Sequence, residues 1–227
     1  MGYFFAKASS GSSSPTPELL WWKMTDGSGT AVTATVGPNG TTNADWVTGL
    51  SGSGNALDFN GSSDGLSSDS TIAFGTNALT VCLLVNLDST SGTQILAESS
   101  ANFGANPVAW AIYIDSGNIV GGIAQTGPLF RLEQCAAPST GVTVAIAVVF
   151  ERTTTSGNIT IYFDGVAQTT TVPDNSLNST TDFTTRSVYV GARNNASLWC
   201  NGRIDDVRIY NRALNSTEVA QVRDDKQ

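Results

Sequence analysis

Residues 159–166 read Ile159-Thr160-Ile161-Tyr162-Phe163-Asp164-Gly165-Val166 and carry the clearest structural signal in this 227-residue sequence. Ile159, Ile161 and Phe163 occupy every second position, so they share one face of an extended strand. The Asp-Gly pair that follows supplies two residues suited to positive φ, as a type I′ turn requires. The pattern predicts a β-hairpin whose register is set by this turn.

Apolar segments separated by turn residues recur along the chain on both sides of this hairpin. From Leu19 onward they follow one another about every 8–15 residues, a spacing typical of a β-sandwich or barrel. Val142 to Phe150 is almost continuously apolar and predicts a central strand covered on both faces. The predicted strands are residues 19–24, 56–59, 79–87, 93–98, 109–114, 119–124, 142–152, 159–163, 166–172, 187–191 and 204–210.

One short helix is predicted near the end of the chain. Asn215 is suited to cap its first turn, and Glu218 lies three residues later, as in a capping box. Leu214, Val219 and Val222 form its apolar side. Because so short a helix is stable only when packed, we expect these residues to belong to the core. The fold class is therefore all-β with one short C-terminal helix.

Composition excludes several function classes. The chain has 11 Lys and Arg against 19 Asp and Glu, a net charge of −8, and its basic residues are not clustered. Nucleic acid binding needs such clusters, so no nucleic acid partner is expected. No segment approaches 18 apolar residues, so membrane insertion is not expected either.

The absence of histidine and the cysteine count restrict the chemistry further. Without histidine there is no Ser-His-Asp triad and no imidazole metal site. Cys82, Cys135 and Cys200 are an odd number without CxxC spacing, which argues against a zinc site and a complete disulfide framework. We expect three buried apolar thiols.

Residues 1–18 are predicted to form a flexible N-terminal arm and linker, because residues 9–17 are rich in Ser, Gly and Pro. The start lacks a basic region and predicts no secretory signal peptide. Tyr3-Phe4-Phe5 has two interpretations: it is disordered with the arm, or it docks on a neighbouring subunit. The second would make the arm the route to a homo-oligomer.

Four segments, taken in order, resemble the LamG-like jelly-roll family, of the concanavalin A-like lectins and glucanases. They are Leu20-Trp21-Trp22-Lys23-Met24, Gly54-Asn55-Ala56-Leu57-Asp58-Phe59-Asn60-Gly61, Ile161-Tyr162-Phe163-Asp164-Gly165 and Gly202-Arg203-Ile204-Asp205-Asp206-Val207-Arg208-Ile209-Tyr210-Asn211-Arg212-Ala213-Leu214. The resemblance implies a jelly-roll domain over residues 19–227: two stacked antiparallel sheets with the first and last strands adjacent.

The sequence departs from the family at two core positions. Leu83-Leu84-Val85 stands where the family often has a tryptophan, and Cys200 stands where it often has an aromatic residue. Both replacements keep the core apolar. They leave the fold assignment intact but weaken any transfer of the family's ligand residues to this chain.

An enzyme on this fold would be a glycoside hydrolase with two carboxylates about 5–10 Å apart. The family's glucanases carry Glu-x-Asp-x-x-Glu on one strand, and that pattern is absent here. The five glutamates never fall within six residues of one another. We therefore expect no enzyme.

The resemblance suggests calcium as a cofactor, held by six to eight oxygen ligands. Asp205 and Asp206 are the best candidates, with Asp26 on the neighbouring first strand. Ile204 and Val207 break strict alternation, which predicts a bulge that turns one carboxylate toward Asp26. In the alternative, Asp205 accepts backbone hydrogen bonds and Asp206 is solvated.

Carbohydrate binding needs an exposed aromatic plane together with amide or hydroxyl groups. If Leu198 and Cys200 point inward, Trp199 points outward beside the preceding loop. The predicted ligand-binding residues are Trp199, Arg193, Asn194, Asn195, Trp110 and Trp46. The alternative is that these large residues cover the edge of the core or a subunit contact.

These patterns predict a non-catalytic recognition or structural module located on a virion surface or outside the cell. The first hypothesis is a phage virion surface protein, a capsid decoration or tail adhesin, whose partner is a glycan or a capsid protein. The second is a carbohydrate-binding module or lectin from a secreted protein. A glycoside hydrolase is the third, weakened by the lack of paired acids.

Overall fold

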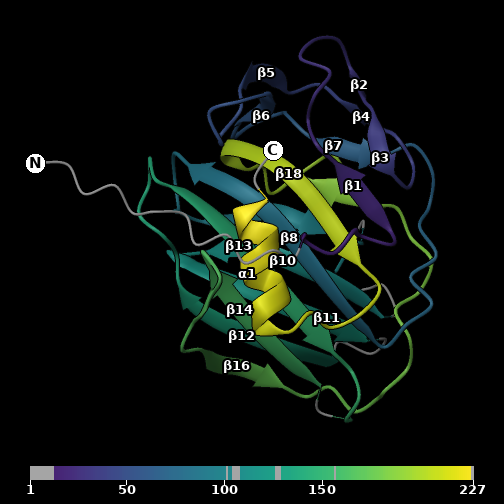
Figure 1. Ribbon diagram of the computed structural model, residues 1–227. Coiled ribbons are helices and arrows are strands. Elements are labelled where there is room, and N and C mark those ends of the chain that lie inside the picture. Colours follow the sequence, from purple (N-terminus) through teal and green to yellow (C-terminus); the bar gives the residue numbers. More distant parts are fainter. Residues whose placement is uncertain (1–12, 101, 104–107, 126–128, 156, 226–227) are drawn as a thin grey trace, which may run out of the picture.

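Two antiparallel β-sheets stacked face to face make up the protein (Figure 1). The computed structural model describes residues 13–100, 102–103, 108–125, 129–155 and 157–225. Apolar side chains from both sheets meet in one continuous core between them. The predicted all-β sandwich with one short C-terminal helix is confirmed.

The first sheet contains nine strands within these described ranges and carries both the first and the last strand of the chain. Its main order is β15 (Val166–Ala167), β14 (Asn158–Phe163), β13 (Thr143–Glu151), β8 (Ala78–Leu87), β18 (Asn201–Tyr210), β1 (Leu20–Trp22) and β3 (Ala34–Val36), with β6 (Asn55–Asn60) paired to β18 and β5 (Asp45–Thr48) paired to β6. The contact of β1 with β18 is the adjacency that the family resemblance implied.

The second sheet also has nine strands in the part of the chain that the structure describes. Its order is β16 (Thr171–Asn175), β12 (Leu129–Ala136), β11 (Asn118–Gln125), β10 (Ala109–Asp115), β9 (Thr93–Glu98), β17 (Tyr189–Val190), β7 (Leu66–Ser68), β4 (Gly40–Thr42) and β2 (Ala31–Val32). Because β17 lies in this sheet and β18 in the other, the segment between them crosses the rim of the sandwich.

The hairpin predicted at residues 159–166 forms, and in the structure its two strands span residues 158–163 and 166–167. β14 and β15 pair with Phe163 opposite Val166. Asp164 and Gly165 have φ of 47° and 79°, as a type I′ turn requires. Ile159 and Ile161 are buried in the main core, so the alternation predicted the inward face correctly.

Helix α1 (Ser216–Asp224) lies across the first sheet on the side away from the main core (Figure 1). Leu214, Val219 and Val222 pack there with Cys82 and Tyr210. The capping box of Asn215 and Glu218 is present, so the prediction of the helix and of its apolar side is confirmed. No helix in the described part of the chain has the length and hydrophobicity needed to span a bilayer.

All three cysteines are buried and unpaired, as predicted. Burial raises the pKa of the Cys82 and Cys200 thiols to about 12, so neither is a nucleophile at neutral pH. The apolar replacements at Leu83, Leu84 and Val85 are also buried, which explains why the departures from the family leave the fold intact.

Several strands were not predicted. β2, β3, β4, β5 and β7 are two to four residues long, too short to show a clear alternation. β12 was missed because Arg131, Glu133 and Gln134 are polar residues that normally lie in solvent. In the structure Glu133 is buried, and its carboxylate accepts hydrogen bonds from Arg131 and Thr170. The single strand predicted over residues 166–172 is two strands, β15 and β16, one in each sheet.

The chain from residue 13 to residue 18 contacts the end of β18 and helix α1. The Ser14 hydroxyl donates to Asp225 Oδ2 at 2.5 Å, and the Tyr210 hydroxyl donates to the Pro15 carbonyl at 3.1 Å. Glu18 forms an ion pair with Arg212. Residues 1–12, including Tyr3-Phe4-Phe5, lie outside the described residues, so the predicted arm and its docking on a second subunit stay predictions.

Candidate functional site

The segment between β17 and β18 folds into a tight hairpin over residues 193–197. The Arg193 N–H donates to the Ser197 carbonyl at 2.8 Å, which closes the hairpin. Asn194 and Asn195 take the two turn positions with φ of 53° and 51°. Asparagine tolerates this left-handed conformation better than other residues that have a side chain. The two asparagines predicted as ligand residues therefore stand exposed at the tip of a rigid turn.

Leu198 continues the chain in an unusual conformation that brings Trp199 to the rim. Its φ of 53° is uncommon for a branched residue, and the Ile95 N–H of β9 holds its carbonyl at 2.8 Å. Trp199 is half-buried and Cys200 fully buried. Leu198 was predicted to point inward, but it is half-buried and lines the same surface hollow as Trp199.

This surface hollow, called the Trp199 hollow below, has a volume of about 350 Å³. It is bounded by the β8–β9 connection, the start of β9 and the segment leading into β18. Its lining residues are Gly61, Ser89, Ser91, Gly92, Thr93, Gln94, Leu198, Trp199 and Asn201. The lining combines one indole with hydroxyl and amide groups, the set that sugar recognition requires.

Gln94 holds the walls of the Trp199 hollow together. Its Nε2 donates to the carbonyls of Ser89 and Ser91 at 3.3 and 2.8 Å, and its Oε1 accepts from the Asn201 N–H at 2.9 Å. Gln94 therefore has little capacity left for a ligand. The Trp199 indole N–H and the Asn201 side-chain amide have no hydrogen-bond partner among the described residues, so both are available to a ligand.

The Arg193 side chain contacts Glu98 of β9, in the second sheet. Its Nε donates to both carboxylate oxygens at 3.2 Å, and its Nη2 donates to Oε2 at 3.1 Å. Glu98 is fully buried, and burial raises its pKa to about 7 while the Arg193 contacts lower it. The Arg193 guanidinium therefore occupies both carboxylate oxygens of Glu98.

Asn195 lies at a second polar hollow on the other side of the hairpin, with a volume of about 360 Å³. The lining residues are Thr30, Thr41, Thr42, Asn43, Ser63, Gly65, Ser67 and Asn195. A Cβ at Gly65 would lie 2.3 Å from Asn195 Oδ1, so the hairpin tip packs here because residue 65 is a glycine. Four of the six predicted ligand residues thus share one loop, although they face different surroundings.

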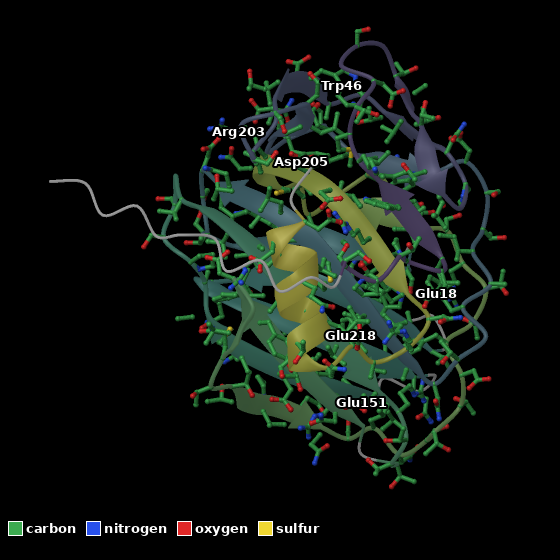
Figure 2. The ribbon with its side chains drawn as sticks, viewed as in Figure 1. Glu18, Trp46, Glu151, Arg203, Asp205 and Glu218 are labelled. Atoms are coloured by element: carbon green, nitrogen blue, oxygen red, sulfur yellow. The ribbon has the colours of Figure 1, made fainter. Side chains whose placement is uncertain are left out.

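Trp110 and Trp46 do not belong to this loop. Trp110 is fully buried in β10, with its ring 6.0 Å from those of Phe74 and Phe150. It is a core residue and offers no surface to a ligand, which corrects the prediction. Trp46 is half-buried on β5, where its indole donates to the Gly29 carbonyl at 2.8 Å (Figure 2). Residue type alone led to both predictions, since burial depends on sheet stacking.

The bulge predicted at Asp205 and Asp206 is present. The pairing of β18 with β8 shifts register between Asp205 and Arg208, and Asp206 has a φ of 48°. Ile204 and Val207 both lie in the main core, as their broken alternation predicted. The extra residue turns the side chain of Asp206 away from the main core, next to that of Asp205.

The three predicted calcium ligands are not brought together by this bulge. Asp26 accepts from the N–H and the hydroxyl of Thr33 at 2.8 and 2.6 Å. Asp206 instead pairs with Arg208 at 2.7 Å. Within the described ranges, no group of three acids, cysteines or histidines is arranged to hold a metal. These residues do not fit a calcium site, and calcium binding elsewhere stays a prediction that chelation and thermal unfolding would test.

Asp205 partly matches the alternative that had been set beside calcium. Its Oδ2 accepts from the Leu50 N–H at 3.1 Å, as that alternative required. Asp206, in contrast, is buried and accepts from the Trp21 indole at 2.7 Å, so it is not solvated. Tertiary packing supplies both partners, and no local pattern identifies them.

The residues that sequence reasoning missed are those that complete the Trp199 hollow. Ser89, Ser91, Gln94 and Asn201 resemble ordinary turn and surface residues in the sequence. Only the pairing of the Leu198 carbonyl with β9 places them around one tryptophan. No motif in the sequence signals this arrangement.

Comparison with known proteins agrees with this geometry. Residues 60–220 match the family described as the concanavalin A-like lectin/glucanases superfamily. A comparison with curated proteins found no match.

Solved structures with the same fold include receptor-binding domains of botulinum neurotoxins. The domain of the C/D mosaic serotype is 12% identical with a TM-score of 0.66, over 90% of this chain and 50% of that one. The type G domain is 16% identical with a TM-score of 0.62, over 92% and 51%. A type C structure, titled for cell entry that depends on interaction with two ganglioside molecules, is 13% identical with a TM-score of 0.67, over 92% and 51%.

The chain thus spans about half the length of the solved structures it matches. At these identities the likeness concerns the fold alone. The family match covers more than half of the chain and includes the 193–197 hairpin and Trp199. The protein belongs to the concanavalin A-like lectin/glucanase superfamily.

Proposed function

We propose that the protein is a non-catalytic glycan-recognition module that holds a sugar ring against Trp199. The observation that carries this proposal is the Trp199 hollow itself, in which an indole lies beside the unpartnered amide of Asn201 and beside hydroxyl groups. An indole stacks on the apolar face of a sugar, while hydroxyl and amide groups read the sugar hydroxyls. Asn201 and the Trp199 N–H are the groups free to do so.

The rigidity of the loop supports this role. The Leu198 carbonyl is held by β9, and Cys200 is buried, so the residues on both sides of Trp199 are anchored. A platform that is already ordered loses little conformational entropy when a ligand binds. The receptor-binding function stated for the solved relatives, which share only the fold, is consistent with such a module.

The absence of catalysis is part of the proposal. Hydrolysis of a glycosidic bond requires two carboxylates facing the bond. No acid lines the Trp199 hollow. Glu98, a buried acid that contacts the hairpin through Arg193, accepts hydrogen bonds from two nitrogens of that guanidinium, Nε and Nη2.

The same site would serve either setting predicted from the sequence, a phage virion surface or a secreted lectin. Co-sedimentation of the full-length protein with purified particles tests the virion setting. Binding to particles that survives Trp199→Ala would point to a capsid protein as partner, whereas binding lost with this substitution would point to a glycan.

The test is glycan binding by the full-length protein and two tryptophan variants. Wild type is screened on a glycan array, and the affinity for the best ligand is measured by titration calorimetry. We expect Trp199→Ala to weaken binding about tenfold or more, because loss of a stacking surface costs about 1–2 kcal/mol. Trp46→Ala, which removes another half-buried tryptophan, is the matched control and should bind like wild type.

Circular dichroism establishes that both variants are folded before binding is compared. Absence of any glycan ligand for the wild type would overturn the proposal. Equal binding by the wild type and Trp199→Ala would overturn the assignment of the site.

A further inference from the structure

The Trp199 hollow is electrically neutral inside. None of its nine lining residues carries a formal charge. A buried or half-buried anionic group is stable only where a cation or several donors replace its lost water. The hollow offers two free donors, the Trp199 N–H and the Asn201 amide, but no cation, which disfavours anionic ligands relative to neutral ones.

Carboxylates surround the rim. The exposed Asp88 directly precedes Ser89, and its N–H donates to the Asn201 carbonyl at 3.0 Å. Asp115 is also exposed, and its Oδ1 accepts from the Thr93 hydroxyl at 3.1 Å. Both acids are thus one bond away from residues that line the hollow.

A third carboxylate, Asp58 of β6, lies on the side of Cys200. Burial raises the pKa of the Cys200 thiol, and the negative charges of Asp88 and then Asp58 raise it further. The pairing of β6 with β18 places Asp58 two residues from Asn60, which is opposite the lining residue Asn201. Asp45 and Asp64 act on Asp58 in turn, which extends the negative region along this edge.

Two guanidinium groups lie nearby, and one of them is neutralised. Arg193 is held in two hydrogen bonds by Glu98 on the adjacent face. Arg203 is opposite Asp58 in the pairing of β18 with β6, and its charge opposes the rise that burial causes in the pKa of that carboxyl. Among the described residues, three rim carboxylates therefore stand against one cation, Arg203.

We infer that the Trp199 hollow selects neutral sugars and rejects sialylated or sulfated ones. This inference rests on the proposed glycan-binding function and adds the chemical class of its ligand. For a separation on the order of 8 Å, Coulomb's law predicts that two net negative charges weaken the binding of an anionic substituent about fivefold in low salt. Because these charges are exposed, salt should reduce the discrimination.

The experiment compares each neutral glycan on an array with its sialylated or sulfated counterpart. We expect neutral glycans to bind, their anionic counterparts to bind about fivefold more weakly at 20 mM salt, and this ratio to fall toward one at 500 mM salt. Equal or tighter binding of the anionic counterparts would overturn the inference and leave the glycan-binding function standing. Binding of no glycan would overturn both.

A charge variant isolates the electrostatic cause. Asp88→Asn removes one rim carboxylate without changing a lining residue, so binding of an anionic counterpart should improve about twofold relative to the neutral glycan. Asp224→Asn, an exposed acid on α1, is the matched control and should leave the ratio unchanged. The inference fails if both variants give the wild-type ratio at 20 mM salt.

Discussion

Asp205 is the residue whose environment departs furthest from what its type favours. Its side chain is buried next to Asp206, and only Oδ2 has a partner, the Leu50 N–H. Oδ1 has no partner among the described residues. Burial raises the pKa of Asp205 from 3.8 to about 7, the Leu50 hydrogen bond lowers it, and the charge of Asp206 raises it again. The neutral form of the Asp205 carboxyl is therefore more favoured in the folded protein than in the unfolded chain.

This shift predicts how stability depends on pH. Because the folded pKa lies above the unfolded value, Asp205 destabilises the fold progressively as pH rises from about 4 through 7. Asp205→Asn should remove this loss, so the variant gains stability over wild type by on the order of 2–4 kcal/mol between pH 4 and pH 8. Urea unfolding at each pH measures the difference.

Asp69→Asn serves as the control, since Asp69 is exposed and accepts one hydrogen bond from Thr41. Its difference from wild type should change little over the same pH range. Parallel pH profiles for wild type and Asp205→Asn would contradict the expected titration of Asp205.

At the scale of single elements, helix α1 depends on its first turn. Asn215 Oδ1 accepts from the N–H groups of Thr217 and Glu218 at 3.0 Å. Glu218 Oε2 accepts in return from the Asn215 N–H at 2.9 Å. Three donors that the helix itself leaves unpaired are thus satisfied.

Removal of this cap should be measurable in the whole domain, because α1 covers part of the first sheet. We expect Asn215→Ala to lower the free energy of unfolding by about 1 kcal/mol. Ser216→Ala, one residue along and without a capping hydrogen bond, is the matched control. Chemical denaturation with unchanged m-values checks both variants, and equal stabilities would show that the cap is dispensable.

The helix also contacts the turn of the 158–167 hairpin. Arg223 Nη1 donates to the Asp164 carbonyl at 2.8 Å, and Ala220 lies next to Gly165. Gly165 therefore satisfies two demands, positive φ in the turn and close approach of the helix. The sequence around Gly165 predicted only the positive φ in the turn.

At the scale of the whole molecule, Arg208 connects the two ends of the chain. It is fully buried and binds both carboxylate oxygens of Asp206. It also donates to the Asp225 carboxylate and carbonyl at 3.0 and 2.8 Å and to the Ser14 hydroxyl at 3.4 Å. The Trp21 ring lies 4.3 Å from its guanidinium. One side chain therefore joins β1, β18, the end of α1 and the N-terminal segment.

Truncation of this residue should be among the most damaging changes in the protein. Arg208→Ala leaves Asp206 buried without its cation, so we expect a loss of about 3–5 kcal/mol and a melting temperature about 10 °C lower. Arg203→Ala changes the same residue type at a half-buried position on the same strand and should cost less than about 1 kcal/mol. Differential scanning calorimetry compares the two, and similar melting temperatures would disprove the role of Arg208.

Much of this architecture follows from the sequence alone, because its signals are local. The Asp164-Gly165 turn, the capping box at Asn215 and the broken alternation around Asp206 each depend on residues that are neighbours in the chain. The order of the four segments at residues 20–24, 54–61, 161–165 and 202–214 also predicts the family, which the match over residues 60–220 confirms. Alternation likewise requires that one of the adjacent Trp21 and Trp22 faces the core, and the structure shows that it is Trp22.

Only the tertiary structure decides which groups meet at a site. Alternation assigns a side chain to a face of a sheet but does not say what covers that face, so Trp110 and Trp199 looked alike until the sheets were stacked. The Trp199 hollow is lined by segments more than 100 residues apart in the sequence. Asp206 binds Arg208 and Trp21 and not Asp26. Such contacts depend on strand order and sheet packing. Both involve residues that are far apart in the sequence, so a local sequence pattern cannot predict them.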